Sequence, residues 1–103
     1  MSDVMEKFSL AGRTALVTGG AGLLGKQFTR ALGQAGAKVV VADLNQAVAQ
    51  DHAQAMISEG IKAHTVQVDV TNPDSVSEMV RSTVTKFGSL DVLVNSAALD
   101  PKF

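Results

Sequence analysis

The stretch of sequence that decides the fold reads Thr14-Ala-Leu-Val-Thr-Gly19-Gly-Ala-Gly22-Leu-Leu-Gly25. Its first five residues are apolar or β-branched, as expected of a buried strand. The glycines that follow lead directly into apolar residues at helical spacing. This order, strand then glycine loop then helix, predicts a loop that binds a pyrophosphate at the start of the helix, where backbone N–H groups lack partners.

Each glycine of the loop has an expected role. Gly19 allows a tight turn, Gly22 leaves room for a ligand to approach the backbone, and Gly25 lets the helix pack closely against the sheet. The alternative is a structural turn that binds no ligand. The strand before the loop and the amphipathic helix after it favour the phosphate-binding interpretation.

Outward from this loop, strands and helices alternate along the chain. Further buried strands are predicted at Lys38 to Asp43, His64 to Val70 and Asp91 to Asn95. Helical spacing of apolar residues predicts three helices, with faces at Leu24, Phe28, Leu32 and Ala35, then at Ala49, Ala53 and Met56, then at Val76, Val80, Val84 and Phe87. Gly36, Gly60 and Gly88 are expected to end these helices, and Asn72 and Pro73 to begin the third.

Strands joined by helical crossovers form a parallel sheet. Right-handed crossovers then favour the strand order 3-2-1-4, with a ligand crevice where strands 1 and 4 diverge. The expected fold is therefore α/β, a partial Rossmann fold with three crossover helices. No linker or repeat interrupts the sequence, which predicts one dinucleotide-binding domain over residues 1–103.

Asp43 ends the second predicted strand, at close to the offset of about 20 residues at which an acid binds the adenosine ribose hydroxyls. Its carboxylate would repel a 2′-phosphate, and Leu44 rather than arginine follows it, so the predicted cofactor is NAD rather than NADP. Lys26, a basic residue near the loop, leaves NADP open. Asp43 could instead serve only as a cap for the second helix.

Composition excludes several classes of function. The net charge of -1 and the scattered basic residues argue against nucleic-acid binding, and no apolar stretch is long enough to span a membrane. Asp3 and Glu6 stand where a signal peptide needs positive and apolar residues, so we expect a cytoplasmic protein. The chain has no cysteine, and His52 and His64 lack neighbours at ligand spacing, so no metal site is predicted.

Three motifs carry a resemblance to a known family: the Thr18-Gly19 start of the loop, the triplet Asp69-Val70-Thr71, and the segment Asn95-Ser96-Ala97-Ala98. Together they resemble the classical short-chain dehydrogenases/reductases, from Phe8 onward. The resemblance implies that Asp69 and Val70 contact the adenine ring, and that Asn95 braces the sheet while its neighbours line the cofactor. The alternatives are a helix-entry acid at Asp69 and a turn residue at Asn95. The predicted cofactor-binding residues are Gly19, Gly22, Leu24, Gly25, Asp43, Leu44, Asp69, Val70, Asn95 and Ala97.

The chain departs from the family pattern at several positions. Leu23 stands where the classical loop has glycine, and the spacing of Gly19, Gly22 and Gly25 is that of the extended branch, which modifies nucleotide sugars. Ser96 stands where the family usually has a second asparagine, and Ala98 where it usually has a glycine, and both changes are small. The family's catalytic serine, tyrosine and lysine would lie beyond the fourth strand, and this chain has no tyrosine, so no catalytic residue is predicted.

The resemblance thus implies the amino-terminal half of an NAD-dependent oxidoreductase that acts on an alcohol or carbonyl compound, inactive alone. A non-catalytic module with vestigial nucleotide binding is an alternative, as is an enzyme completed by a second polypeptide. With two helices on one face of the sheet and one on the other, apolar strand surface should stay uncovered. We therefore expect self-association or dependence on a missing carboxy-terminal part.

Overall fold

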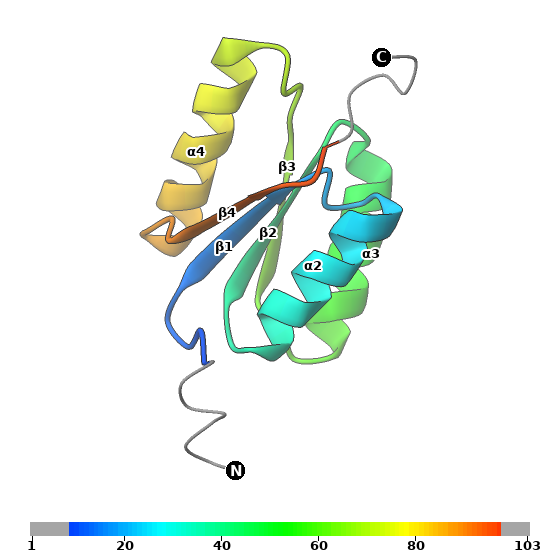
Figure 1. Cartoon of the computed structure of the whole chain (residues 1–103), viewed down its shortest axis with the longest axis vertical. Coiled ribbons are helices and arrows are strands. Elements are labelled where there is room, and N and C mark those ends of the chain that lie inside the picture. Colours follow the sequence, from blue (N-terminus) through cyan, green and yellow to red (C-terminus); the bar gives the residue numbers. More distant parts are fainter. Residues whose placement is uncertain (1–8, 98–103) are drawn as a thin grey trace.

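The computed structural model describes residues 9–97 and shows a parallel sheet between two layers of helix (Figure 1). Residues 1–8 and 98–103, among them Asp3, Glu6, Phe8 and Ala98 named above, lie outside this described part. The strands are β1 (Thr14–Thr18), β2 (Lys38–Asp43), β3 (Ala63–Gln67) and β4 (Val92–Asn95). The helices are α2 (Leu23–Gln34), α3 (Gln46–Ser58) and α4 (Pro73–Phe87).

The strand order is β3-β2-β1-β4, with every pairing parallel, which confirms the predicted topology. Helices α2 and α3 cover one face and α4 the other (Figure 1). All five residues of β1 are buried, because this strand has neighbours on both edges and core on both faces. The carboxyl ends of the four strands therefore meet at one edge of the sheet.

Two cores hold these layers together. Between the sheet and helices α2 and α3, the buried residues of β1 and β2 meet Ala49, Ala53 and Met56, the face predicted for α3. On the other side, Leu16 and Val40 pack against Met79 of α4. Burial of this aliphatic surface is the main favourable term in folding.

The predicted apolar faces of α2 and α4 are correct in part: Leu32 of α2 and Val76 and Phe87 of α4 pack against the cores, but the other predicted residues do not. Helix α2 buries Gly25 and Thr29, whereas Leu24 is 56% and Phe28 is 38% exposed. Helix α4 buries Met79 and Thr83 and leaves Val80 and Val84 partly exposed. Each buried threonine donates its hydroxyl hydrogen to a carbonyl of its own helix, so its polar atom is satisfied without water.

Strand β3 ends three residues earlier than predicted, and its start lies one residue earlier. The Asp69 carboxylate accepts hydrogen bonds from the backbone N–H and hydroxyl of Thr71, at 3.0 and 2.6 Å, and the Asp69 carbonyl accepts from Asn72. These bonds turn the chain toward α4. Strand β4 begins at Val92, one residue later than predicted. At Asp91 the carboxylate accepts the Thr14 N–H at 2.8 Å, and the Asp91 N–H donates to the Thr14 carbonyl at 2.9 Å.

The helix ends follow the predicted chemistry. The Asn72 side chain accepts hydrogen bonds from the first turn of α4, Pro73 is its first residue, and Gly88 closes it with φ 87°. Gly36 and Gly60 also take positive φ, one residue after the caps of α2 and α3. These signals fix where each crossover turns back to the sheet.

A buried histidine joins α2 to α3. The Thr29 hydroxyl donates to the Lys26 carbonyl, so its oxygen can accept a hydrogen bond from Nε2–H of His52, 2.6 Å away. Burial lowers the pKa of His52 below its ordinary 6.5, and the cations Lys26 and Arg30 lower it further, while Glu59 opposes them. His64 on β3 is half-buried, and burial likewise lowers its pKa.

We predict that acid weakens the fold through His52. A histidine whose pKa is lower in the folded state contributes full stability above its unfolded pKa of 6.5, and that stability falls as the pH drops below this value. Urea unfolding between pH 5 and 7.5 should show that the free energy of unfolding falls less steeply with decreasing pH for His52→Gln than for the wild type. The same measurement on His64→Gln gives the contribution of His64 to the pH dependence of stability. Equal pH slopes for His52→Gln and wild type would contradict the role of His52.

Candidate functional site

The glycine loop after β1 is packed between the ends of two neighbouring strands. Gly19 has φ 66°, and a Cβ on it would lie 2.7 Å from the Cα of Ala97, just beyond β4. The Gly20 N–H donates to the Ala42 carbonyl of β2, and the Gly22 N–H donates to the Gly19 carbonyl. The loop is therefore fixed by its backbone, and Gly19 makes the tight turn that was predicted.

The first turn of α2 offers free hydrogen-bond donors. Gly22 is its N-cap and supplies no side chain, and the first bond of the helix runs from Lys26 N–H to the Gly22 carbonyl. Within residues 9–97, no group accepts a hydrogen bond from the N–H of Leu23, Leu24 or Gly25. The side chain of Leu23 is 87% exposed, so it does not plug this end of the helix.

Gly25 brings α2 against the loop, not against the sheet as predicted. A Cβ at this position would lie 2.0 Å from the Gly19 carbonyl oxygen and 2.8 Å from the Gly20 Cα. Real Cβ atoms do not approach backbone this closely. The start of the helix can therefore sit on the turn only because residue 25 is glycine.

Asp43, at the end of β2, faces the loop. One carboxylate oxygen accepts the Ala21 N–H at 3.0 Å, and the other accepts the Asn45 N–H at 3.0 Å. The cap of α3 is Asn45, whose side chain accepts the Val48 N–H, so the alternative in which Asp43 serves only as this cap is wrong. Two oxygens with about four acceptor positions keep capacity for further donors. Leu44 beside it is 66% exposed.

Asp69 and Val70 follow the backbone bond that joins the end of β3 to Asp43. The Val68 N–H donates to the Asp43 carbonyl at 3.0 Å, which extends the sheet by one residue toward Asp69. Val70 is half-buried against the α4-side core. The hydroxyl and N–H of Thr71 lower the pKa of the exposed Asp69 carboxyl, so it is negatively charged at neutral pH. Asn72 is the N-cap of α4, and Asp69 forms the turn that leads into this helix, so the helix-entry alternative for Asp69 stays open beside the adenine contact.

Asn95 joins the central strands at this edge. The Thr18 hydroxyl donates to the side-chain oxygen of Asn95 at 2.7 Å, and the Thr18 carbonyl accepts from both the N–H and the hydroxyl of Ser96, at 3.1 and 2.5 Å. Asn95 is the last residue of β4, not a turn residue. These bonds hold Ala97 against Gly19. The structure thus brings the ten predicted residues to one edge of the sheet, where their role in binding stays a prediction.

The match to a family model decides the affiliation. Residues 13–103 match the model described as short chain dehydrogenase. The chain belongs to the short-chain dehydrogenase family. Its described fold agrees, since the solved structure of a dehydrogenase/reductase from Sinorhizobium meliloti superposes with a TM-score of 0.91 at 34% identity, over 96% of this chain and 40% of that one.

Two further relatives of this short-chain dehydrogenase are informative. A protein named 3beta-hydroxysteroid dehydrogenase 2, from Eggerthella lenta, is 39% identical over 99 residues, which are 96% of this chain and 38% of that one. An oxidoreductase from Haemophilus influenza, solved with bound NAD, has a TM-score of 0.86 at 26% identity, over 96% of this chain and 36% of that one. The chain therefore spans about 38% of the length of a curated relative that it matches.

The predicted cofactor-binding residues did not include Thr18, Gly20, Ala21 and Ser96, which shape this edge of the sheet. Ala21 supplies the N–H that orients Asp43, and Gly20 is buried, with a Cβ position 2.9 Å from the Val17 carbonyl oxygen. Thr18 and Ser96 form the bonds that align β1 with β4. The small size of residues 20 and 21 was the available signal. Ala21 and Gly20 bond to Asp43 and Ala42 of β2, and glycine spacing does not reveal such contacts with another strand.

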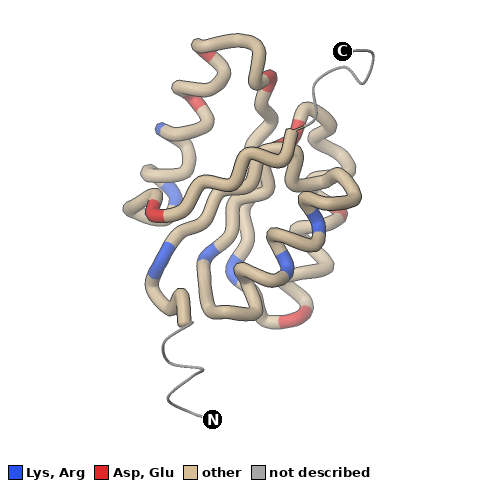
Figure 2. Tube along the Cα trace, in the orientation of Figure 1, with Lys and Arg blue, Asp and Glu red and all other residues tan. Residues whose placement is uncertain are grey.

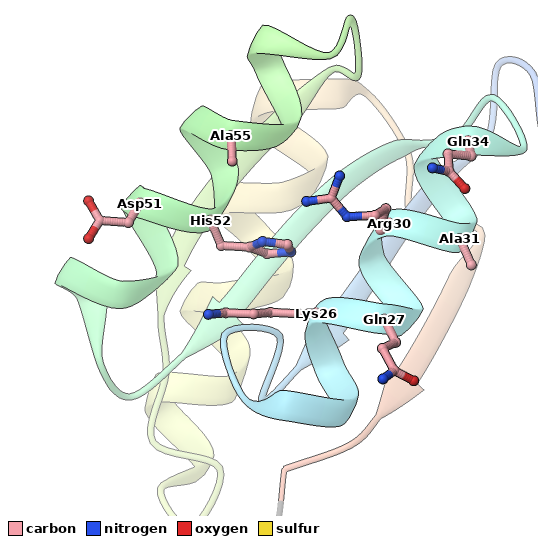
Figure 3. Close-up of a pocket in the computed structure, with 8 residues that line it drawn as sticks. All are labelled: Lys26, Gln27, Arg30, Ala31, Gln34, Asp51, His52 and Ala55. Atoms are coloured by element: carbon pink, nitrogen blue, oxygen red, sulfur yellow. The ribbon is translucent and has the colours of Figure 1, made fainter.

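A cavity of about 630 Å³ lies elsewhere, between α2 and α3 (Figure 3). In it, Lys26 and Arg30 extend from α2 toward α3 on either side of His52, while Asp51 points away (Figure 3). Arg30 pairs with Glu59. The glycine loop and Asp43 do not line this groove. We therefore place the candidate site at the carboxyl edge of the sheet.

Within residues 9–97, no three metal-ligating side chains gather into a group. None of the helices in this part of the chain has the length and apolar character needed to cross a bilayer.

We predict that Gly25→Ala disrupts the loop, whereas Gly22→Ala is tolerated. The added methyl group at residue 25 must displace the Gly19 backbone, and overpacking of this kind costs about 1–3 kcal/mol. At residue 22 the backbone is extended, the residue is exposed, and the nearest atom would lie 3.3 Å away. Urea unfolding of both variants tests this difference. An equal loss of unfolding free energy in Gly25→Ala and Gly22→Ala would contradict the close contact between residue 25 and the Gly19 backbone.

Proposed function

We propose that this chain binds NAD(H) along the carboxyl edge of its sheet. The observation that carries the proposal is the pairing of three free N–H groups at the start of α2 with the Asp43 carboxylate, which the Ala21 N–H orients toward the same loop. A pyrophosphate would accept hydrogen bonds from Leu23, Leu24 and Gly25. Asp43 would accept them from the hydroxyls of the adenosine ribose.

Further residues of the edge suit the rest of the dinucleotide. Leu44 and Val70 offer apolar contact to the adenine ring, and Asp69 offers an acceptor to its amino group. On the other side of the loop, Gly19 and Ala97 leave only backbone and a methyl group facing the path of the cofactor beyond β4. NAD bound to the relative from Haemophilus influenza supports this choice of ligand.

Charge favours NAD over NADP. Asp43 is the last residue of β2 and Asp69 lies two residues beyond β3, both at the carboxyl edge of the sheet. Figure 2 shows acidic positions, in red, along the chain at this edge. A 2′-phosphate placed beside Asp43 would meet like charge, which costs binding free energy. Lys26 extends instead toward His52 in the α2–α3 cavity (Figure 3). We therefore propose NAD as the physiological cofactor.

The reaction we propose for the whole protein is oxidation of an alcohol or reduction of a carbonyl compound. The nicotinamide ring, when bound, carries the hydride. The residues of this chain bind and orient the cofactor by its pyrophosphate and ribose. A proton donor must also be positioned on the substrate oxygen. The chain has no tyrosine, so we propose that further polypeptide supplies the acid and the substrate pocket. The cysteine-free composition supports a reducing compartment, the cytoplasm.

Calorimetric titration with NAD and NADP tests the cofactor. The wild type should bind NAD more tightly than NADP. Asp43→Ala should weaken NAD binding roughly 10- to 100-fold, because a hydrogen bond to a charged group contributes about 1.5–3 kcal/mol. Asp43→Asn, which keeps an acceptor for Ala21 but loses the charge, should reduce the preference for NAD.

Asp51→Ala is the matched control, since Asp51 is an exposed acid on α3 that points away from His52 (Figure 3). It should bind NAD like the wild type. Equal NAD affinity for Asp43→Ala and wild type would contradict the assigned role of Asp43. Absence of binding to either dinucleotide by folded wild-type protein would overturn the proposed function and favour a non-catalytic module.

A further inference from the structure

The cavity of about 630 Å³ between α2 and α3 is lined by polar groups that the proposed cofactor site does not use. His52 extends into it from α3, with Lys26 and Arg30 of α2 on either side of the ring (Figure 3). Ala31 and Ala55 also line it, and their small side chains leave space between the two helices. Two cations and an imidazole ring therefore face one another across a space that can admit a small ligand.

The electrostatic environment of this cavity is positive. Within the described part of the chain, the ammonium group of Lys26 has no ion-pair or hydrogen-bond partner. Arg30 pairs with Glu59 through one nitrogen, Nη1, so its other N–H groups remain available as donors. Asp51, the acid among the lining residues, points away (Figure 3). Lys26 and Arg30 each lower the pKa of His52 more than Glu59 raises it, as a positive potential at the ring requires.

His52 adds a hydrogen-bond acceptor to the two cations. The Thr29 hydroxyl donates to the Lys26 carbonyl, so its oxygen can accept only from Nε2–H, and the neutral ring then carries its hydrogen on Nε2. The other ring nitrogen, Nδ1, has no hydrogen-bond partner within residues 9–97, and it remains accessible although His52 is only 6% exposed. Since burial lowers the pKa of His52 below 6.5, the ring is neutral at about pH 7.5, and Nδ1 is an acceptor.

We propose that this cavity binds the hydrogen phosphate ion. The unprotonated oxygens of the ion would accept hydrogen bonds from Lys26 and Arg30, and its P–OH group would donate to Nδ1 of His52. Cationic donors beside a neutral acceptor match an oxyanion that keeps a proton at neutral pH, as inorganic phosphate does. Sulfate and carboxylates keep none, so either would place an acceptor against the lone pair of Nδ1.

This phosphate site is distinct from the proposed pyrophosphate site. The pyrophosphate would bind the amides of Leu23, Leu24 and Gly25 at the end of α2, whereas the Lys26 side chain extends sideways toward α3 (Figure 3). None of the three amide-bearing residues lines the cavity, and neither does Asp43. Phosphate and NAD can therefore bind together, and the inference does not depend on the proposed function.

Two-dimensional NMR of ¹⁵N-labelled protein, titrated with sodium phosphate at about pH 7.5, tests the proposal. Ionic strength is held constant, because salt screens an exposed cation such as Lys26. The amide signals of Lys26, Arg30 and His52 should shift and saturate together. Sulfate is the matched ligand, with the same shape and no proton, and should bind roughly 10-fold more weakly. Absence of saturable phosphate binding, or equal affinity for the two ions, would overturn the proposal.

Lys26→Gln removes the free cation and should weaken phosphate binding roughly 10-fold, because a charge-assisted hydrogen bond is lost. Lys86→Gln is the matched control, since Lys86 is an exposed lysine of α4, on the other face of the sheet (Figure 1). It should bind phosphate like the wild type. An equal loss of affinity in both variants would reduce the effect to net charge and overturn the proposal.

A titration in the presence of saturating NAD separates the two sites. Phosphate affinity should be unchanged by NAD, since the two ligands would occupy different sides of α2. Competition between phosphate and NAD would place the ion at the amides of the first turn, which would overturn this inference and leave the cofactor site intact. Phosphate binding by a protein that binds no NAD would support this inference and contradict only the proposed function.

Discussion

The arrangement of the site depends on the close approach of α2 to the turn that precedes it. Gly25 lies so near the Gly19 carbonyl that any side chain there would collide with backbone. This contact aims the first turn of α2 at the end of β1, and the same turn presses Gly19 against Ala97 beyond β4. The free N–H groups, the Asp43 carboxylate and the end of β4 are thereby held around one point.

Much of the fold could be predicted because its signals are local. The bounds of β1 and β2 follow from compact runs of β-branched residues, and the strand order follows from short connections and right-handed crossovers. The cap at Asn72 and the turn at Gly88 were visible for the same reason. The candidate residues also fell at one edge of the sheet, because parallel strands place their carboxyl ends together.

The parts that were missed depend on contacts between distant segments. Apolar spacing oriented α2 by Leu24 and Phe28, but the contact at Gly25 rotates the helix and buries Thr29, whose hydroxyl is satisfied by its own helix and by His52. Strand β3 was predicted too long because a run of β-branched residues does not show that Asp69 binds Thr71. The partner of Asp43, the Ala21 N–H, is a backbone group 22 positions away and leaves no mark on composition.

In the proposed complex, bare amides at the start of α2 receive the pyrophosphate of NAD. Titration of ¹⁵N-labelled protein with NAD, followed by two-dimensional NMR, tests this contact most directly. We expect the amide signals of Leu23, Leu24 and Gly25 to shift most, and to saturate together with that of Ala21. Saturable binding that leaves these amides unmoved, and shifts Arg30 and His52 in the α2–α3 cavity instead, would contradict it.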